Sequence, residues 1–140
     1  MQIRGPEQED ARTLVTLAAL VVGERRAAQL VRSHLERHEL VVADEDGAVA
    51  GFLAYRTDWF GCAFVSLVVV AETARRRGVA RALFGAVERR LPSPRLFSST
   101  EETNVASIQM HRALGFSPSG YIDNLPQGYR ELLFYKRLRP

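Results

Sequence analysis

The arginines and the glycine of Arg75-Arg76-Arg77-Gly78-Val79-Ala80-Arg81 form the stretch of this chain best suited to bind an anion. Guanidinium groups stay charged at any pH near neutrality. Gly78 and Ala80 keep side-chain bulk away from the backbone. If a helix begins here, its first amides point outward and carry about half a positive charge. These residues therefore predict a phosphate-binding turn.

The residues on either side predict a strand before this turn and a helix after it. Phe64 to Val70 is an almost continuous apolar run that ends in three β-branched valines, which is typical of a strand covered on both faces. From Val79 onward, apolar residues recur at i, i+3, i+4, i+7 and i+8, the stripe of an amphipathic helix. The strand and the helix would hold the turn between them.

A second group of polar residues follows a predicted strand over residues 95–100. Asn104, Ser107 and His111 are spaced at i, i+3 and i+7, so on a helix they share one face. Imidazole titrates at about 6.5 and a thiol at about 8.5, so His111 could protonate a departing thiolate. Glu101 could deprotonate an amine. A histidine that packs under the sheet, and an acid that favours a helix start, explain the same residues without chemistry.

Taken together, the two segments resemble the GNAT acetyltransferase superfamily. RRRGVA is similar to the signature R/Q-x-x-G-x-G/A, with Arg75, Gly78 and Ala80 at the matching positions. NVASIQMHRALGF is similar to N-x-x-A-x-x-x-Y-x-x-x-G-F, with Asn104 at the asparagine position and His111 in place of the tyrosine. The resemblance covers roughly residues 40 to 138, and the preceding helices match only in order.

The resemblance implies an acetyl-CoA-dependent N-acetyltransferase. Such an enzyme moves the acetyl group to a primary amine, of a small molecule or a protein, by direct attack in a ternary complex. The turn would cradle the pyrophosphate, and the strand and helix would border the pantetheine arm. The residues implied in binding acetyl-CoA are Val68, Val69, Val70, Arg75, Arg76, Arg77, Gly78, Val79, Ala80, Arg81, Asn104 and Ser107. The candidate catalytic residues are His111 and Glu101, and a homodimer is a further expectation from the family.

Several alternatives stay open on the sequence. The chain could be a non-catalytic acyl-CoA-binding or regulatory protein, with His111 replacing a needed acid. Related enzymes often carry a glutamate where this chain has Ser98 and Ser99, which leaves the general base undecided. Nucleic acid is not expected as a partner, because the arginines are confined to one turn without interleaved aromatic residues.

Composition describes an ordinary globular protein. The 140 residues suit a single N-acetyltransferase domain, 1–140, and 46% of them are hydrophobic and 25% charged. No apolar run approaches the roughly 20 residues that span a bilayer, so no membrane association is expected. A single cysteine, Cys62, and the absence of a signal-peptide pattern favour the cytoplasm. His34 and His38 are four residues apart but have no apparent third ligand, so no metal is expected.

The expected elements follow the order β-α-α-β-β-β-α-β-α-β-β. This order implies a mixed α/β fold of the GNAT type, with six to seven strands and about four helices covering both faces. Strands are predicted over residues 1–4, 40–43, 48–55, 62–70, 95–100, 116–122 and 131–138, and turns over 46–47 and 57–61. Helices are predicted from about Pro6 to Gly23, and over 24–38, 79–91 and 105–114.

Overall fold

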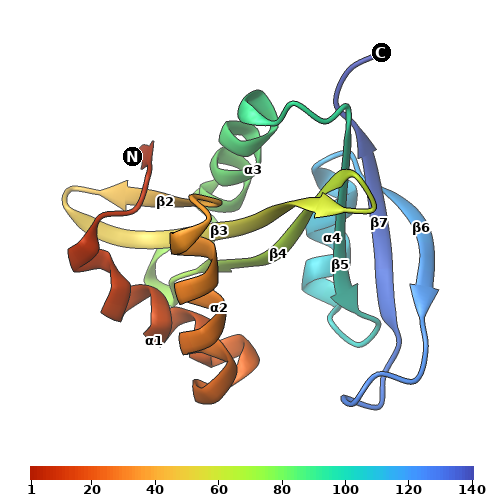
Figure 1. The fold of residues 1–140 in the computed structure, drawn as a ribbon, viewed down its shortest axis with the longest axis horizontal. Helices are drawn as coiled ribbons and strands as arrows, with labels where there is room; N and C mark the ends of the chain where they lie inside the picture. The colour runs from red at the N-terminus through yellow and green to blue at the C-terminus, as the bar shows by residue number, and fades with distance from the viewer. The chain divides into compact units, whose positions relative to one another are not determined.

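The computed structural model describes residues 1–140, and its seven strands form one mixed sheet in the order β1-β2-β3-β4-β5-β7-β6 (Figure 1). The strands are β1 (Gln2–Arg4), β2 (Leu40–Glu45), β3 (Ala48–Trp59), β4 (Cys62–Val70), β5 (Arg95–Glu101), β6 (Ser117–Ile122) and β7 (Glu131–Arg137). The helices are α1 (Ala11–Val22), α2 (Glu24–Glu36), α3 (Val79–Arg90) and α4 (Val105–Ala113), with short 3-10 turns η1 (Gln8–Asp10) and η2 (Glu72–Ala74). The predicted mixed sheet and element order are confirmed. No helix has both the length and the apolar character needed to cross a membrane.

The chain divides into two compact units that share β3 and β4. The first unit comprises Met1–Arg56 with Ser66–Arg90, and the second comprises Thr57–Val65 with Leu91–Pro140. The first therefore contains α1, α2 and α3, whereas the second contains α4 and the last three strands. Each unit is described below by itself.

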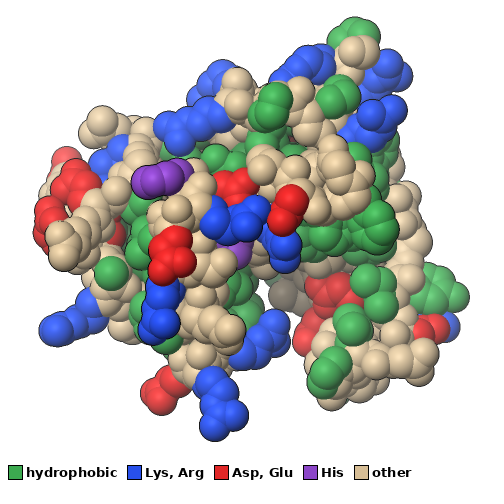
Figure 2. Space-filling model, viewed as in Figure 1, with side chains coloured by type: hydrophobic (Ala, Val, Ile, Leu, Met, Phe, Trp, Pro, Cys, Tyr) green, Lys and Arg blue, Asp and Glu red, His purple; other side chains and the backbone are tan.

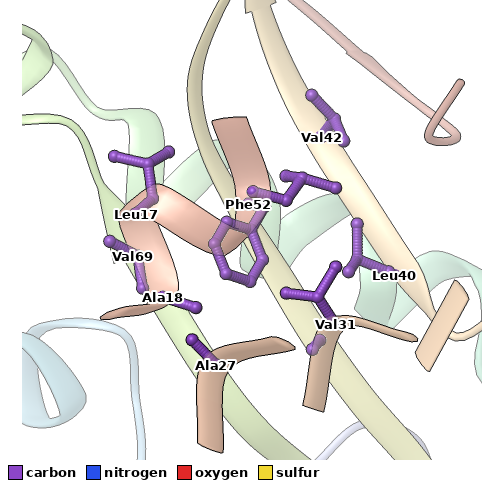
Figure 3. Packing of buried hydrophobic residues seen from close by; sticks show 10 residues of the cluster. Leu17, Ala18, Ala27, Val31, Leu40, Val42, Phe52 and Val69 are labelled. Carbon is purple, nitrogen blue, oxygen red and sulfur yellow. The ribbon is translucent and has the colours of Figure 1, made fainter. Parts of the chain in front are cut away.

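The first unit has a core between the sheet and the pair α1 and α2. Phe52 of β3 is completely buried, and in Figure 3 its ring lies among side chains from both helices and from neighbouring strands. The cluster comprises Leu14, Leu17, Ala18, Ala27, Val31, Leu40, Val42, Phe52, Ala54 and Val69. The members on β2 and β3 have even residue numbers, as expected of strand residues that share one face.

A second apolar layer lies on the opposite face of the same strands. Val41 and Leu53, the register neighbours of the residues just described, are also completely buried. The apolar stripe of α3 supplies Val79, Leu83, Phe84 and Val87, each 2% exposed or less. Helices thus cover both faces of these strands, which explains why β2 reads as an unalternating apolar run.

Arg4 joins three elements near the start of the chain. Its guanidinium donates to both carboxylate oxygens of Asp10, at 2.8 and 3.1 Å, and to Asp44 Oδ2 at 2.8 Å. These bonds link β1 to the start of α1 and to the end of β2. The hydrogen bonds from Arg4 hold the pKa of both carboxyl groups below its usual range. Both carboxylates therefore stay charged, and both keep the ion pair, well below neutral pH.

Gly51 lets β3 and β4 approach closely where β4 ends. A Cβ atom built on Gly51 would lie 2.6 Å from the carbonyl oxygen of Val69 and 3.3 Å from a methyl carbon of Val79. The amide of Ala71 donates to the carbonyl of Ala50 at 2.8 Å, which holds the two strands together at this level. No side chain can occupy this space without displacing backbone. Gly51 therefore positions both the end of β4 and the start of α3.

The second unit is a small sheet with α4 on one face. In it β4 pairs with β5 in parallel through Ala63 and Phe64, and β7 lies antiparallel to both β5 and β6. Even-numbered residues of β5 are buried, whereas odd-numbered ones are half-buried or exposed. This alternation identifies one face covered by α4 and one face open to solvent.

The predicted turn over residues 57–61 is wrong in extent. Thr57, Asp58 and Trp59 belong to β3, and only Phe60 and Gly61, both at positive φ, form the turn into β4. The Trp59 ring stacks on Phe64 with centroids 4.8 Å apart, so cross-strand packing extends the hairpin beyond the point at which Thr57-Asp58 suggested a break.

The close approach at Gly51 makes a stability prediction. Gly51→Ala should lower the free energy of unfolding by about 1–3 kcal/mol, because the new methyl group must push the β3 and β4 backbones apart. Denaturant unfolding measures this. Gly5→Ala is the matched control, since a Cβ there meets no atom within 4 Å. Equal stability of the two variants would show that the strands separate without cost.

Candidate active site

The turn between β4 and α3 has the backbone of an anion-binding helix start. Gly78 has a φ of 77°, which L side chains rarely adopt, and Arg76 has a φ of 66° despite its side chain. The Ala82 amide donates to the Gly78 carbonyl at 3.0 Å, the first bond of the helix. The amides of the three intervening residues therefore lie at the open helix end. A Cβ on Gly78 would meet no atom within 4 Å, so the space beside this end is open.

The arginines of this turn are not equivalent. Arg77 forms an ion pair with Glu45 of β2, with 2.9 Å between Nη2 and Oε2. Arg75 and Arg76 make no ion pair, and the Arg75 side chain contacts only the Val70 carbonyl, at 3.4 Å. All three side chains are exposed. Glu45 thus offsets one charge, and Arg75 and Arg76 supply the free positive charge of the turn.

The three valines at the end of β4 are held from one side. The Val69 side chain belongs to the buried cluster under α1 and α2, whereas Val68 and Val70 are half-buried. The Val69 carbonyl approaches Gly51 as described above. Val68, Val69 and Val70 thus lead directly into the turn, in one unit with Arg75, Gly78 and Arg81, as the sequence predicted.

In the second unit, Asn104 begins α4. Its Oδ1 atom accepts a hydrogen bond from the Ser107 amide at 3.1 Å, and its own amide donates to the Glu101 carbonyl at 3.0 Å. Asn104 is therefore the N-cap of the helix. Its side chain is exposed, and its amide nitrogen makes no hydrogen bond within the protein. The structure thus brings Glu101, Asn104 and Ser107 together at the end of β5.

His111 lies in the core of the second unit, with 1% of its surface exposed. Its ring stacks on Phe134 at a centroid distance of 4.6 Å and meets Phe116 edge-on. Nδ1 lies 2.8 Å from the Ser107 carbonyl, and Nε2 lies 2.7 Å from Ser98 Oγ. Because a carbonyl only accepts, Nδ1 carries the proton and Nε2 accepts from the Ser98 hydroxyl.

This environment keeps His111 neutral. Burial lowers its pKa below the ordinary 6.5, and the hydrogen bond to the Ser107 carbonyl offsets this only in part. A buried imidazole with both nitrogens engaged has no direct path to a substrate. The geometry favours the packing role that the sequence left open, and the acid role of His111 stays a prediction.

His34 repeats this arrangement in the first unit. Its Nδ1 lies 2.9 Å from the Leu30 carbonyl, one turn earlier in α2, and its Nε2 lies 2.9 Å from Ser66 Oγ of β4. Each histidine thus clamps a helix to a strand serine. No group of three or more His, Cys, Asp or Glu residues in the chain is assembled to hold a metal ion.

A charged cleft of about 480 Å³ lies at the loop between β6 and β7. Its lining residues are Glu102, Asp123, Asn124, Leu125, Gly128, Tyr129 and Arg130. Arg130 donates to Asp123 at 2.9 Å through its side chain and to Glu102 at 2.7 Å through its amide. The sequence pass had treated this segment as a long loop. The acidic residues near Arg130 were the only signal of a cleft.

Comparison with known proteins decides the family. The model of the acetyltransferase (GNAT) family matches residues 9–116. The chain belongs to the GNAT acetyltransferase family. A GNAT-family acetyltransferase from Bacillus cereus is 31% identical to it, with a TM-score of 0.88 over 97% of this chain and 96% of that chain. No curated protein sequence matches the chain.

More distant GNAT structures share the fold. A ribosomal-protein-alanine N-acetyltransferase from Brucella melitensis is 23% identical, with a TM-score of 0.79 over 98% of this chain and 99% of that chain. An aminoglycoside 6'-N-acetyltransferase crystallised with coenzyme A is 16% identical, with a TM-score of 0.84 over 100% of this chain and 98% of that chain. The predicted GNAT fold is therefore confirmed over the full length, including the first two helices.

Sequence reasoning missed Gly51 as a residue of this GNAT site. The signal was present, because a glycine inside an apolar strand pattern often marks close backbone approach. It also missed the hydrogen bond between His111 and Ser98, since the two residues lie on different elements. The partner of Arg77 could not be inferred, because Glu45 reads as an ordinary hairpin acid.

The neutral state of His111 predicts a pH dependence of stability. The unfolded chain takes up a proton near pH 6.5, but the folded chain does so only at lower pH. The free energy of unfolding should therefore be full above about pH 6.5 and fall on acidification. His111→Tyr removes this titration, so its stability should change less between pH 7.5 and 5.5 in urea unfolding. If His111 instead acts as an acid, His111→Ala should lower kcat by roughly 10²–10⁴-fold per folded molecule.

Proposed function

We propose that this chain is a single-domain, acetyl-CoA-dependent N-acetyltransferase that acts on a primary amine in a ternary complex. The observation that carries the proposal is the helix start at Gly78. There a left-handed glycine, open space and free positive charge occur together in a chain of the GNAT family. A cytoplasmic setting, expected from the single cysteine, is part of the proposal.

The residues of this turn suit a pyrophosphate. The amides of Val79, Ala80 and Arg81 lie at the positive end of α3, where phosphate oxygens bind well. Arg75 and Arg76 add charge without an internal partner, in contrast to Arg77. Acetyl-CoA, when bound, supplies an activated acetyl thioester. The backbone of Val68, Val69 and Val70 would pair with the pantetheine amides, as the family resemblance implies, and one of these amides would stabilise the oxyanion.

The transfer itself asks little of side chains beyond position and protons. The amine nitrogen forms a bond to the acetyl carbon, the carbon–sulfur bond breaks, and the thiolate gains a proton. An alkyl ammonium has a pKa of about 10, so the amine must first lose a proton. Glu101 is the candidate base, because its half-buried side chain has no ion-pair or hydrogen-bond partner. The buried position of His111 makes water a second source of the thiolate proton.

The acceptor is a small-molecule or protein amine. By their names, one relative acts on an aminoglycoside and another on a ribosomal-protein alanine, so this fold accommodates both kinds of acceptor. The cleft beside β6 and β7 carries Glu102 and Asp123. Carboxylates there would attract a cationic amine by steering. Nucleic acid and membranes are not part of the proposal.

A non-catalytic acyl-CoA-binding role is the alternative function. It is favoured by one observation, the burial of His111 at the position of the family's tyrosine. A screen of amine acceptors with thiol detection separates the two functions, and mass spectrometry then identifies the acetylated product. Thiol release that depends on an amine supports the enzyme. Acetyl-CoA binding without any turnover supports the alternative.

The helix start makes a binding prediction. Gly78→Glu should weaken acetyl-CoA binding by roughly tenfold or more, because a carboxylate would occupy the open space and repel the phosphates. Calorimetry on the folded variant measures this. Gly23→Glu is the matched control, since Gly23 also begins a helix, has a φ of 85° and has no atom within 4 Å of its Cβ position. Unchanged affinity of Gly78→Glu would refute the turn as the phosphate site.

Asn104 allows a test that separates capping from binding. Asn104→Asp keeps the oxygen that caps α4 but loses the amide donor, whereas Asn104→Ala loses both. Both variants should bind acetyl-CoA several-fold more weakly, since one lost hydrogen bond costs about 0.5–1.5 kcal/mol. Only the alanine variant should lose the roughly 0.5–2 kcal/mol of an N-cap. If the aspartate variant binds normally, Asn104 is a cap and nothing more.

A further inference from the structure

The open face of the second unit carries aromatic rings between two bands of opposite charge. Odd-numbered residues of β5 and β7 point away from α4, because Ser98 and Phe134 contact His111 on the other face. The register then orders the open face from one strand end to the other. Its cross-strand pairs are Arg95 with Arg137, Phe97 with Tyr135, Ser99 with Leu133, and Glu101 with Glu131.

The aromatic rings form one connected set, here called the aromatic face: Trp59, Phe64, Phe97 and Tyr135. Trp59 lies 4.8 Å from Phe64 and 5.1 Å from Phe97, and Phe97 lies 5.2 Å from Tyr135, between ring centroids. All four side chains are half-buried, so each keeps part of its ring surface in solvent. Figure 2 shows hydrophobic side chains in the open over β5 and β7.

The charges at the two ends lack partners of opposite sign. Arg95 and Arg137 are exposed and form no ion pair. Glu101 and Glu131 lie directly opposite each other on neighbouring strands, an arrangement that destabilises a sheet unless positive charge approaches. Glu131 accepts hydrogen bonds only from Ser99 and Gln127, both neutral. Each end of the face would therefore gain from a surface of opposite charge.

We propose that the aromatic face binds a second copy of this chain. Two copies placed face to face are related by a two-fold axis in the plane between them. An axis parallel to the strands would bring arginines onto arginines. An axis across the strands reverses the strand direction, so that Arg95 meets Glu101 of the second copy and Arg137 meets its Glu131. The charge pattern thus selects one orientation in which both ends are complementary.

The composition of this face is that of a protein interface. Aromatic residues are enriched at interface centres, and charged residues belong at the rim. Both conditions hold here, with the rings in the middle and the charges at the strand ends. Because the rim contacts are ion pairs, the dimer should weaken as salt is added. We expect a reversible dimer.

Sedimentation velocity over a range of protein concentrations tests the dimer. The doubly substituted variant Arg95→Glu with Arg137→Glu carries only acidic ends, and Glu101→Arg with Glu131→Arg carries only basic ends. Each alone should self-associate roughly tenfold more weakly or worse, and an equimolar mixture should form a heterodimer. Arg25→Glu with Arg26→Glu, on the exposed start of α2, is the control of equal charge change and should dimerise like the wild type. Emission of Trp59, the only tryptophan, should shift with concentration in the wild type.

Two results would overturn the dimer. A wild-type chain that stays monomeric at millimolar concentration excludes it. Dimerisation that persists in both variants, when circular dichroism shows them folded, places the interface elsewhere. If the wild type is monomeric and the reversals instead raise the KM for an amine, the face recognises the acceptor. Loss of acetyl transfer without loss of dimerisation would bear on the proposed function alone.

Discussion

The approach of two backbones at Gly51 is the constraint on which the phosphate-binding turn depends. β4 must end close to β3 so that the chain can enter the turn in register with the start of α3. The carbonyl of Val69 and the side chain of Val79 both occupy space that a Cβ on Gly51 would need. One missing methyl group therefore sets the strand end and the helix start at once. The left-handed backbone of Arg76 and Gly78 then completes a sharp reversal over few residues.

The electrostatic organisation of the chain follows the same economy. Charges that hold the fold are paired: Arg4 bridges Asp10 and Asp44, and Arg77 binds Glu45. Charges without such partners gather at two places, the turn before α3 and the open face of β5 and β7. A free charge at a half-exposed site costs little and attracts ligands or partners of opposite sign. The distinction between paired and unpaired arginines is therefore a guide to which of them act outside the fold.

Much of the fold could be predicted from short-range signals. The valine run of β4, the stripe of α3 and Gly115 at the end of α4 each state their structure locally. Asn104 was predicted for a ligand contact, and it proves also to cap α4, which its place before Val105 already allowed. Contacts across the chain could not be read in this way. The position of His111 on a helix face was predictable, but its burial depends on Phe134 and Ser98, which only the sheet brings beneath α4. Thr57 and Asp58 favoured a turn locally, and the stacking of Trp59 on Phe64 prevailed.

The two histidine clamps have a spectroscopic consequence. Each imidazole holds one ring proton on Nδ1, bonded to a carbonyl in its own helix and shielded from water. Such a proton exchanges with solvent only when its surroundings open. His34 belongs to the unit with α2, and His111 to the unit with α4. Resolved imidazole proton signals would thus give each half of the protein its own internal clock of local opening. Comparing the two exchange rates would show whether the halves open together or independently.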